Sequence, residues 1–293
     1  MGSRHIPVMV EEVMAFLRCE PGHTYVDATL GGGGHASEIL KRSAPDGMLI
    51  GLEWDEEALS EARKTLVSFG NRIKLFRENF VHLPDLMKAE SADGILLDLG
   101  LSTIQLEKEE RGFSFKGEGP LDMRMDQRRN ETAADLVNHL SSEEMESILA
   151  QYGEERWAKR IVRAIVQERE REPIRTPQAL RKIVHRSVPR RFHSHRIDPA
   201  TRTFQALRIR VNEELENLKK ILETGWKILR KGGRMCVISF HSLEDRLVKE
   251  MFRALEKQGK MVILTKKPVT PSEEEQKRNP RSRSAKLRCT ERI

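Results

Sequence analysis

The stretch YVDATLGGGGHA, residues 25–36, decides how this chain folds. It predicts a short strand at 25–28 that runs into four consecutive glycines at 31–34, and a helix at 35–42. In this order, a strand, a glycine turn and a helix let the backbone approach a ligand closely and leave free N–H groups at the helix N-terminus. The stretch therefore predicts an α/β unit with a ligand-binding loop.

The same alternation of strand and helix continues through the first third of the chain. The segment DGILLDL at 93–99 is a continuous apolar run, which is typical of a strand covered on both faces. Such an alternation predicts a mostly parallel sheet. The further elements predicted here are strands at 47–52, 71–77 and 93–99 and a helix at 56–69.

The middle of the chain predicts an inserted helical domain, because no strand pattern occurs between about Leu106 and Leu207. We assign 1–106 and 208–293 to the α/β domain and 107–207 to the insertion. Helix starts are indicated by the Ser141/Glu144 capping box, by Thr176-Pro177 and by Asp198-Pro199.

The strand pattern returns after the insertion. Apolar residues at spacings of three and four predict one long amphipathic helix from Leu207 to Leu229, ending at Gly232-Gly233. A strand at 235–240 and a helix at 243–256 follow. Two short strands near 261–265 and 285–289 are expected to close the sheet as a hairpin around the polar loop 271–280.

Composition excludes several classes of protein. The chain has 293 residues, is 38% hydrophobic and carries a formal charge of +7. It contains no uncharged apolar run near the roughly 18 residues that a membrane helix needs, and its first residues lack the apolar stretch of a signal peptide. We therefore expect a soluble cytoplasmic protein that does not bind membranes, with its three cysteines reduced and structural.

The positive charge is concentrated in two windows. Residues 156–210 hold 16 Lys and Arg against 4 acids, and residues 277–293 hold 7 against 1. A basic patch on an otherwise acidic body is typical of proteins that bind a phosphate-bearing polymer, although a single charge run is more often a solvated helix face. Two separate windows favour nucleic acid.

Several acids are expected to meet at one crevice with the glycine loop. The pattern Gly31-x-Gly33-x-x-Ala36, followed by Glu53 about 20 residues on, predicts an adenosine-containing cofactor whose ribose hydroxyls bind the acid. This spacing does not separate NAD from S-adenosylmethionine. In an open α/β sheet ligands bind at the carboxyl ends of the strands, where we expect Asp27, Glu53, Asp98 and Ser239 to converge.

Longer motif blocks resemble the ribosomal RNA small subunit methyltransferase H family, and they span essentially the whole chain. They are DATLGGGGHA (27–36), GILLDLGLS (94–102), ERGFSF (110–115), GPLDMRMD (119–126), YGEER (152–156), ATRTFQA (200–206), ISFHSLEDR (238–246) and NPRSRS (279–284).

The resemblance implies a class I, Rossmann-like, S-adenosylmethionine-dependent methyltransferase. Such an enzyme methylates the N4 amine of one cytidine in the decoding region of bacterial small-subunit (16S) rRNA. It implies cofactor contacts from Gly33, Gly34, His35, Glu53, Phe80, Asp98 and Gln105. Two departures from the family pattern matter: Glu53 stands where Asp is usual, and Thr103-Ile104 replaces Ser-Pro before Gln105.

For two of these residues, a purely structural role fits the sequence as well as cofactor binding or better. Phe80 follows the third strand and can stack on adenine, although Phe there is more often a core residue. The helix dipole is expected to keep His35 neutral, and a loop histidine satisfied by backbone is an equal alternative.

The chemistry requires an acceptor for the proton that the amine loses. We rank Asp98 first as the catalytic residue, with Ser102 and His241 as alternatives. At the start and end of the insertion, arginines and aromatics are suited to contact phosphates and an unstacked base. The predicted RNA-binding residues are Arg111, Phe113, Arg124, Arg202, Phe204, Arg208 and Arg210.

Parts of the sequence also fit two other functions, and one motif has the appearance of a metal site. A nicotinamide-dependent dehydrogenase fits the glycine spacing and Glu53 but leaves the basic windows unexplained. An RNA-binding assembly factor with a degenerate methyltransferase fold is the third hypothesis. His193-Ser194-His195 lacks the partners of a metal site, so no metal is predicted. Small-subunit rRNA, within the small ribosomal subunit, is the expected partner.

Overall fold

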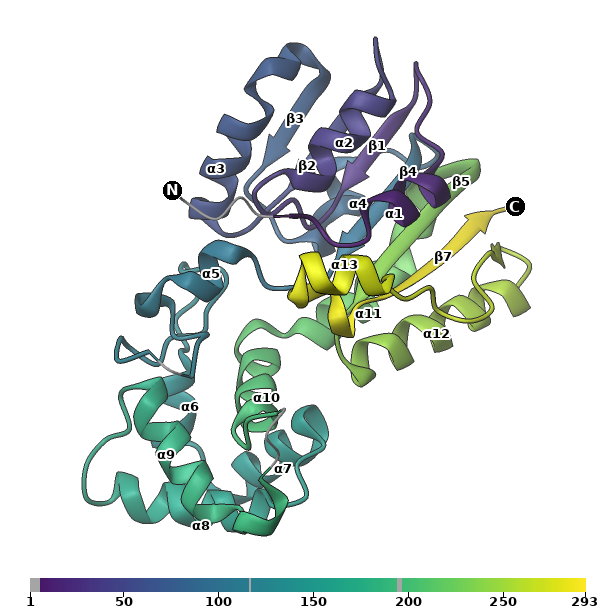
Figure 1. The fold of residues 1–293 in the computed structure, drawn as a ribbon. Coiled ribbons are helices and arrows are strands. Elements are labelled where there is room, and N and C mark those ends of the chain that lie inside the picture. The colour runs from purple at the N-terminus through teal and green to yellow at the C-terminus, as the bar shows by residue number, and fades with distance from the viewer. Residues whose placement is uncertain (1–5, 116, 194–196) are drawn as a thin grey trace. The chain divides into compact units, whose positions relative to one another are not determined.

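The structure is a computed structural model that describes residues 6–115, 117–193 and 197–293. It forms two compact units, which we call the sheet unit (up to Ser102 and from Leu215) and the helical unit (Thr103–Glu214) (Figure 1). The sequence had placed the boundaries at 107 and 207. The helical unit therefore begins earlier and ends later than predicted.

The sheet unit contains a seven-stranded sheet in the order β3-β2-β1-β4-β5-β7-β6. The first five strands pair in parallel, whereas β7 runs antiparallel to both β5 and β6. This confirms the predicted α/β fold and the C-terminal hairpin. The strands are β1 Thr24–Asp27, β2 Met48–Leu52, β3 Ile73–Phe76, β4 Ala92–Asp98, β5 Leu229–Ser239, β6 Met261–Ile263 and β7 Lys286–Arg292.

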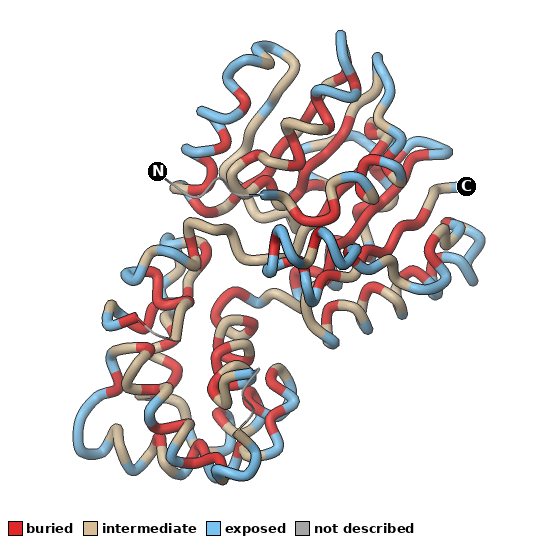
Figure 2. The backbone as a smooth tube through the Cα atoms, in the orientation of Figure 1, coloured by how far each residue is buried: buried red, intermediate tan, exposed pale blue. Residues whose placement is uncertain are grey.

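Helices cover both faces of this sheet, and Figure 2 shows the strands as its buried centre. In β4, Leu96 packs with α1, α2 and α3, whereas Ile95 and Leu97 pack with α11 and α12 on the opposite face. This alternation explains the continuous apolar run of 93–99. The helices are α1 Val10–Leu17, α2 Gly34–Arg42, α3 Glu56–Leu66, α4 Leu83–Leu86, α11 Glu214–Thr224, α12 Ser242–Lys257 and α13 Glu273–Arg278.

The sequence predicts that a helix ends at Gly232 and Gly233. In the structure these two glycines lie inside β5. The register between β4 and β5 shifts there, from the pair Ala92–Leu229 to the pair Gly94–Arg234. Gly232 has φ +80°, and a Cβ on Gly233 would lie 2.8 Å from the carbonyl oxygen of Arg230. The two glycines therefore form a bulge.

In its described residues the helical unit has helices and no strand, as predicted. Both reciprocal hydrogen bonds of the capping box between Ser141 and Glu144 are present, and Thr176 caps α9. Asp198 is not the N-cap of α10, because the helix begins at Thr201 with Ala200 as its N-cap; the Asp198 carboxylate binds Arg181 and His185 and accepts from Ala200 N. The elements are α5 Thr103–Glu107, α6 Ala133–His139, α7 Ser142–Gly153, α8 Ala158–Arg169, α9 Pro177–Ser187, α10 Thr201–Asn212 and the 3-10 turns Glu109–Arg111 and Arg190–Phe192.

The long helix predicted from Leu207 to Leu229 is two helices. α10 ends at Asn212, where Glu213 takes the left-handed conformation with φ +52°. The Asn212 side chain is fully buried: its Nδ2 donates to Met123 O at 2.8 Å and its Oδ1 accepts from Met125 N at 2.8 Å. The apolar residues of α10 therefore pack in the helical unit, and those of α11 pack on the sheet.

Cys19, Cys236 and Cys289 are free thiols, as predicted. Cys236 and Cys289 face each other across β5 and β7 in the core.

Among the described residues, no helix combines the length and apolar character needed to cross a bilayer.

Candidate active site

The glycine loop between β1 and α2 needs its glycines for two physical reasons. Gly31 and Gly33 have φ of +53° and +85°, which side chains disfavour. A Cβ on Gly33 would lie 3.2 Å from Leu66 Cγ, and one on Gly34 would lie 3.1 Å from Pro7 Cγ. The loop therefore packs closely against α3 and the N-terminal segment.

Glu53 follows β2 and is tied to this loop. Its Oε2 accepts from Gly31 N and its Oε1 accepts from Asp55 N, both at 2.9 Å. The residue is only 8% exposed, and burial raises the pKa of its carboxyl to about 7, although the two backbone N–H donors oppose the shift. The predicted acid therefore lies beside the glycine loop, as the spacing of the motif required.

Asp27 and Asp98 lie at the ends of the neighbouring strands β1 and β4. Thr29 connects them: its N–H donates to Asp27 Oδ1 at 3.3 Å, and its Oγ1 accepts from Asp98 N at 2.6 Å. Asp27 Oδ2 and Asp98 Oδ1 are buried and have no hydrogen-bond partner among the described residues. Burial raises the pKa of Asp27 to about 6. Thr29 was not predicted as a site residue, although its position two residues after a strand-ending acid was visible in the sequence.

His35, in the first turn of α2, completes this acidic cluster. It is 5% exposed, and its Nε2 lies 3.5 Å from Asp98 Oδ2. Burial lowers the pKa of the imidazole, but the carboxylates of Asp98 and Asp27 outweigh burial and raise the pKa above its usual value. The two carboxylates thus act against the effect that the helix dipole is expected to have on His35, whose neutral state stays a prediction.

The other predicted residues of the sheet unit have more structural surroundings. Phe80, in the 3-10 turn Phe80–His82 after β3, is half-buried and packs against the α11–α12 side of the core. Ser239 donates to Lys286 O at 3.3 Å in the adjacent β7. Ser102 is the last residue of the sheet unit before the helical unit, and Gln105 is buried within α5 of the helical unit.

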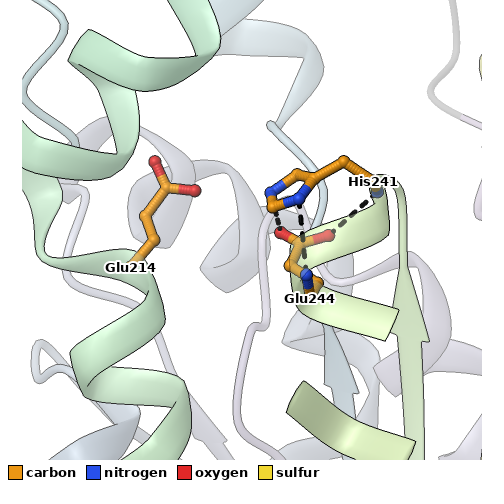
Figure 3. Close-up of side chains that lie close together, drawn as sticks. All are labelled: Glu214, His241 and Glu244. Carbon is orange, nitrogen blue, oxygen red and sulfur yellow. Dashed lines mark hydrogen bonds and ion pairs between the residues drawn. The ribbon is translucent and has the colours of Figure 1, made fainter. Parts of the chain in front are cut away.

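His241 caps α12 together with Glu244 (Figure 3). Its Nδ1 accepts from Glu244 N at 3.4 Å, and its Nε2 lies 3.0 Å from Glu244 Oε1. Glu244 Oε2 accepts from Phe240 N at 2.8 Å. Both imidazole nitrogens therefore face groups of the helix start.

Three of the predicted RNA-binding residues are core residues of the helical unit. Arg111 is 1% exposed, and its Nη2 donates to Arg124 O at 2.9 Å and to Met125 O at 3.1 Å. Phe113 and Phe204 are 7% and 5% exposed. This burial corrects the prediction that these three side chains contact RNA, because none of them offers a surface in the unit.

The four remaining arginines bind carboxylates or a carbonyl of the same unit. RNA contact by these residues stays a prediction. Their contacts are Arg124 with Asp122 at 2.7 Å, Arg208 with Glu214 at 2.8 Å, Arg210 with Glu131 at 2.9 Å, and Arg202 with Glu154 O at 2.8 Å. The motif His193-Ser194-His195 was predicted not to bind a metal. His193 Nε2 lies 3.0 Å from Val188 O, and Ser194 and His195 lie outside the described residues.

A mostly parallel sheet in which β7 runs antiparallel between β5 and β6, with a glycine loop after β1 and acids at the ends of β1, β2 and β4, is the fold of the class I methyltransferases. The fold is similar to that of a proposed rRNA-methylase from Clostridium thermocellum, with a TM-score of 0.50 and 12% identity, covering 99% of this chain and 100% of that chain. The model of the MraW methylase family matches residues 2–293, and the chain belongs to this family.

The chain also matches curated relatives along almost its full length. The ribosomal RNA small subunit methyltransferase H of Geotalea uraniireducens is 49% identical, and that of Trichlorobacter lovleyi is 48% identical. In both cases the match covers 99% of this chain and 98% of the relative. The chain is thus an S-adenosylmethionine-dependent methyltransferase, and the dehydrogenase hypothesis is wrong.

The residues of the sheet unit fit this cofactor. The glycine loop leaves backbone close to a ligand, and Glu53 offers carboxylate oxygens for ribose hydroxyls. The buried oxygens of Asp27 and Asp98 that have no described partner need donors, which the amino groups of a cofactor or substrate can supply.

Proposed function

We propose that this protein transfers a methyl group from S-adenosylmethionine to the N4 amine of a cytidine in the decoding region of 16S rRNA, within the small ribosomal subunit in the cytoplasm. The names of its relatives support rRNA as the substrate. The resemblance of the motif blocks supports a cytidine as the target and its N4 as the methylated atom. The observation that supports the chemistry best is the unpartnered Asp98 oxygen beside the glycine loop.

Each residue of the cluster has a proposed role in binding. Gly33 and Gly34 let the backbone contact the cofactor, Glu53 accepts hydrogen bonds from the ribose, and Phe80 stacks on the adenine. Gln105 is proposed as a further cofactor contact. The bound cofactor supplies an electrophilic methyl group on its sulfonium.

Transfer forms a bond between N4 and the methyl carbon as the carbon–sulfur bond breaks, and N4 then loses one proton. We assign Asp98 Oδ1 as the acceptor of this proton. The backbone of Asp98 is fixed by Thr29, and its other oxygen faces His35. The capping hydrogen bond that His241 Nδ1 accepts at the start of α12 favours Asp98 over that alternative, and Ser102 remains the second choice.

The test is methylation of unmodified small subunits with labelled S-adenosylmethionine, followed by nucleoside mass spectrometry. We expect the label on N4 of one cytidine and a loss of about 100-fold or more in rate for Asp98→Asn. Asp85→Asn is the matched control, because the Asp85 side chain is 79% exposed. Ser102→Ala is expected to retain most of the rate.

The alternative outcomes have separate meanings. If the wild-type protein binds cofactor and subunit tightly but yields no labelled nucleoside, the assembly-factor hypothesis gains and the proposed reaction fails. If Asp98→Asn transfers methyl at the wild-type rate, the reaction stands but Asp98 is not the acceptor.

No metal is proposed to take part. We expect full transfer activity after exhaustive chelation and dialysis. Activity that is lost on chelation and restored by zinc would contradict this expectation.

A further inference from the structure

A cluster of aromatics and arginines lies on the surface of the helical unit. Phe192 is 40% exposed, and its ring centroid is 5.3 Å from that of Trp157. The Arg156 guanidinium lies 4.0 Å from the Phe192 centroid and 5.1 Å from that of Trp157. Arg191 lies 5.0 Å from the Phe192 centroid. The exposed Phe192 ring thus packs beside the partly buried Trp157 ring, with guanidinium groups next to both.

An open groove of about 620 Å³ lies in the same part of the helical unit, and three of its lining residues are arginines. Its wall is fixed by His193, whose Nε2 lies 3.0 Å from Val188 O, and by His185, whose ring meets that of His193 edge to face. The groove is lined by Arg160, His185, Arg186, Val188, Pro189, Arg190 and His193.

The charge of this surface is largely uncompensated. Within the parts of the chain that the structure describes, no carboxylate pairs with Arg156, Arg160, Arg190 or Arg191. Arg186 does pair with a carboxylate, that of Glu168, at 3.1 Å. This contrasts with Arg124, Arg208 and Arg210, which all bind acids of the unit. Four arginines of the basic window 156–210 therefore lie on this surface without a carboxylate partner among the described residues.

We propose that this surface, made of Arg156, Trp157, Arg160, Arg190, Arg191 and Phe192, binds an unpaired segment of the substrate RNA. Arginines without carboxylate partners attract phosphates, and exposed aromatic rings and guanidinium planes stack on unstacked bases. An acidic peptide would use the charges but not the rings. The inference deepens the proposed function, since it names how the helical unit holds the RNA that the sheet unit methylates.

The test measures RNA binding and methyl transfer separately on the full-length protein. The probes are unmodified small subunits and a single-stranded 16S rRNA fragment that contains the decoding region. The variants are Arg190→Gln/Arg191→Gln and Phe192→Ala. Arg128→Gln is the control, because Arg128 is a half-exposed arginine of the same unit that is paired with Asp126.

We expect the variants to weaken RNA binding and raise KM for subunits about tenfold, with kcat and the Kd for S-adenosylmethionine unchanged. The double arginine variant should also reduce the slope of log K against log salt by about 1.4. Phe192→Leu keeps the apolar bulk without the ring, so it should fold like the wild type and still lose binding.

The inference is overturned if both variants bind and react like Arg128→Gln. It is equally overturned if Phe192→Leu binds like wild type and the double arginine variant keeps the wild-type salt slope. If the wild type binds RNA through these residues but transfers no methyl group, the surface stands and the proposed function fails. If the wild type transfers methyl and the variants do so with wild-type KM, only the surface fails.

Discussion

At the scale of single residues, burial is what makes the acids at the strand ends unusual. The carboxyl groups of Glu53 and Asp27 have pKa values raised to about 7 and about 6, because each is nearly inaccessible to water. A Glu53 that is neutral below pH 7 accepts weaker hydrogen bonds than an ionised one. Cofactor affinity should therefore depend on pH.

We predict that S-adenosylmethionine binds about fivefold more tightly at pH 8 than at pH 6, since hydrogen bonds to a charged acceptor are stronger by about 1 kcal/mol. Glu53→Gln should bind more weakly and lose this pH dependence. Titration calorimetry at the two pH values measures both effects. A variant that keeps the wild-type pH profile would place the titrating group elsewhere.

The same shifts predict how stability changes with pH in the absence of cofactor. Because the folded pKa of Glu53 lies above its ordinary value of 4.5, the folded protein binds more protons than the unfolded chain between about pH 4.5 and 7. The contribution of Glu53 to the free energy of unfolding is thus fully present below pH 4.5 and is lost as pH rises through 7. Chemical denaturation at several pH values should show that Glu53→Gln removes part of the decrease in the free energy of unfolding between pH 4.5 and 7. The part removed is expected to be on the order of 1–3 kcal/mol.

Sequence motifs predict the positions of some of these residues and not of others. Gly33, Glu53 and Asp98 were predictable, because strand ends and glycine turns are local features that the topology brings to one edge. The burial of Arg111 was not, since it depends on Nη2 donating to the carbonyls of Arg124 and Met125, and no local pattern distinguishes a buried arginine from a phosphate-binding one.

At the scale of elements, local signals succeed where a helix or strand is decided by its own residues. The strand at β4 and the capping box of α7 follow from apolar runs and cap chemistry within a few positions. The break between α10 and α11 does not, because it depends on Asn212 binding the backbone of Met123 and Met125 far along the chain. The apolar spacing continues across the break, so periodicity alone predicts one helix.

The start of α12 provides a prediction that separates capping from catalysis. Asn is among the best N-cap residues, so His241→Asn should keep both the helix and most of kcat. His241→Ala should lower the free energy of unfolding by about 1 kcal/mol. Thermal denaturation and methyl-transfer assays on both variants test this. If His241→Asn folds normally but is inactive, His241 has a chemical role, and the assignment of Asp98 must be revised.

At the scale of the whole molecule, the two ligands of the enzyme are expected to bind at places of opposite charge. The chain carries +7 overall, yet the windows 156–210 and 277–293 together carry far more positive charge than that, so the remainder is acidic. The first window lies in the helical unit and the second in the sheet unit. The RNA is a polyanion, whereas carboxyl groups surround the proposed cofactor site.

Salt should therefore affect the two ligands very differently. We predict that the Kd for small subunits rises steeply between 50 and 300 mM KCl, with a log–log slope of about −0.7 in the association constant for each phosphate contacted on unpaired RNA. The Kd for S-adenosylmethionine should change by less than about twofold over the same range, because burial shields its contacts from mobile ions. Filter binding for the subunit and calorimetry for the cofactor, in matched buffers, measure the two slopes. A flat slope for the subunit would mean that shape or apolar contacts, and not the two basic windows, hold the RNA.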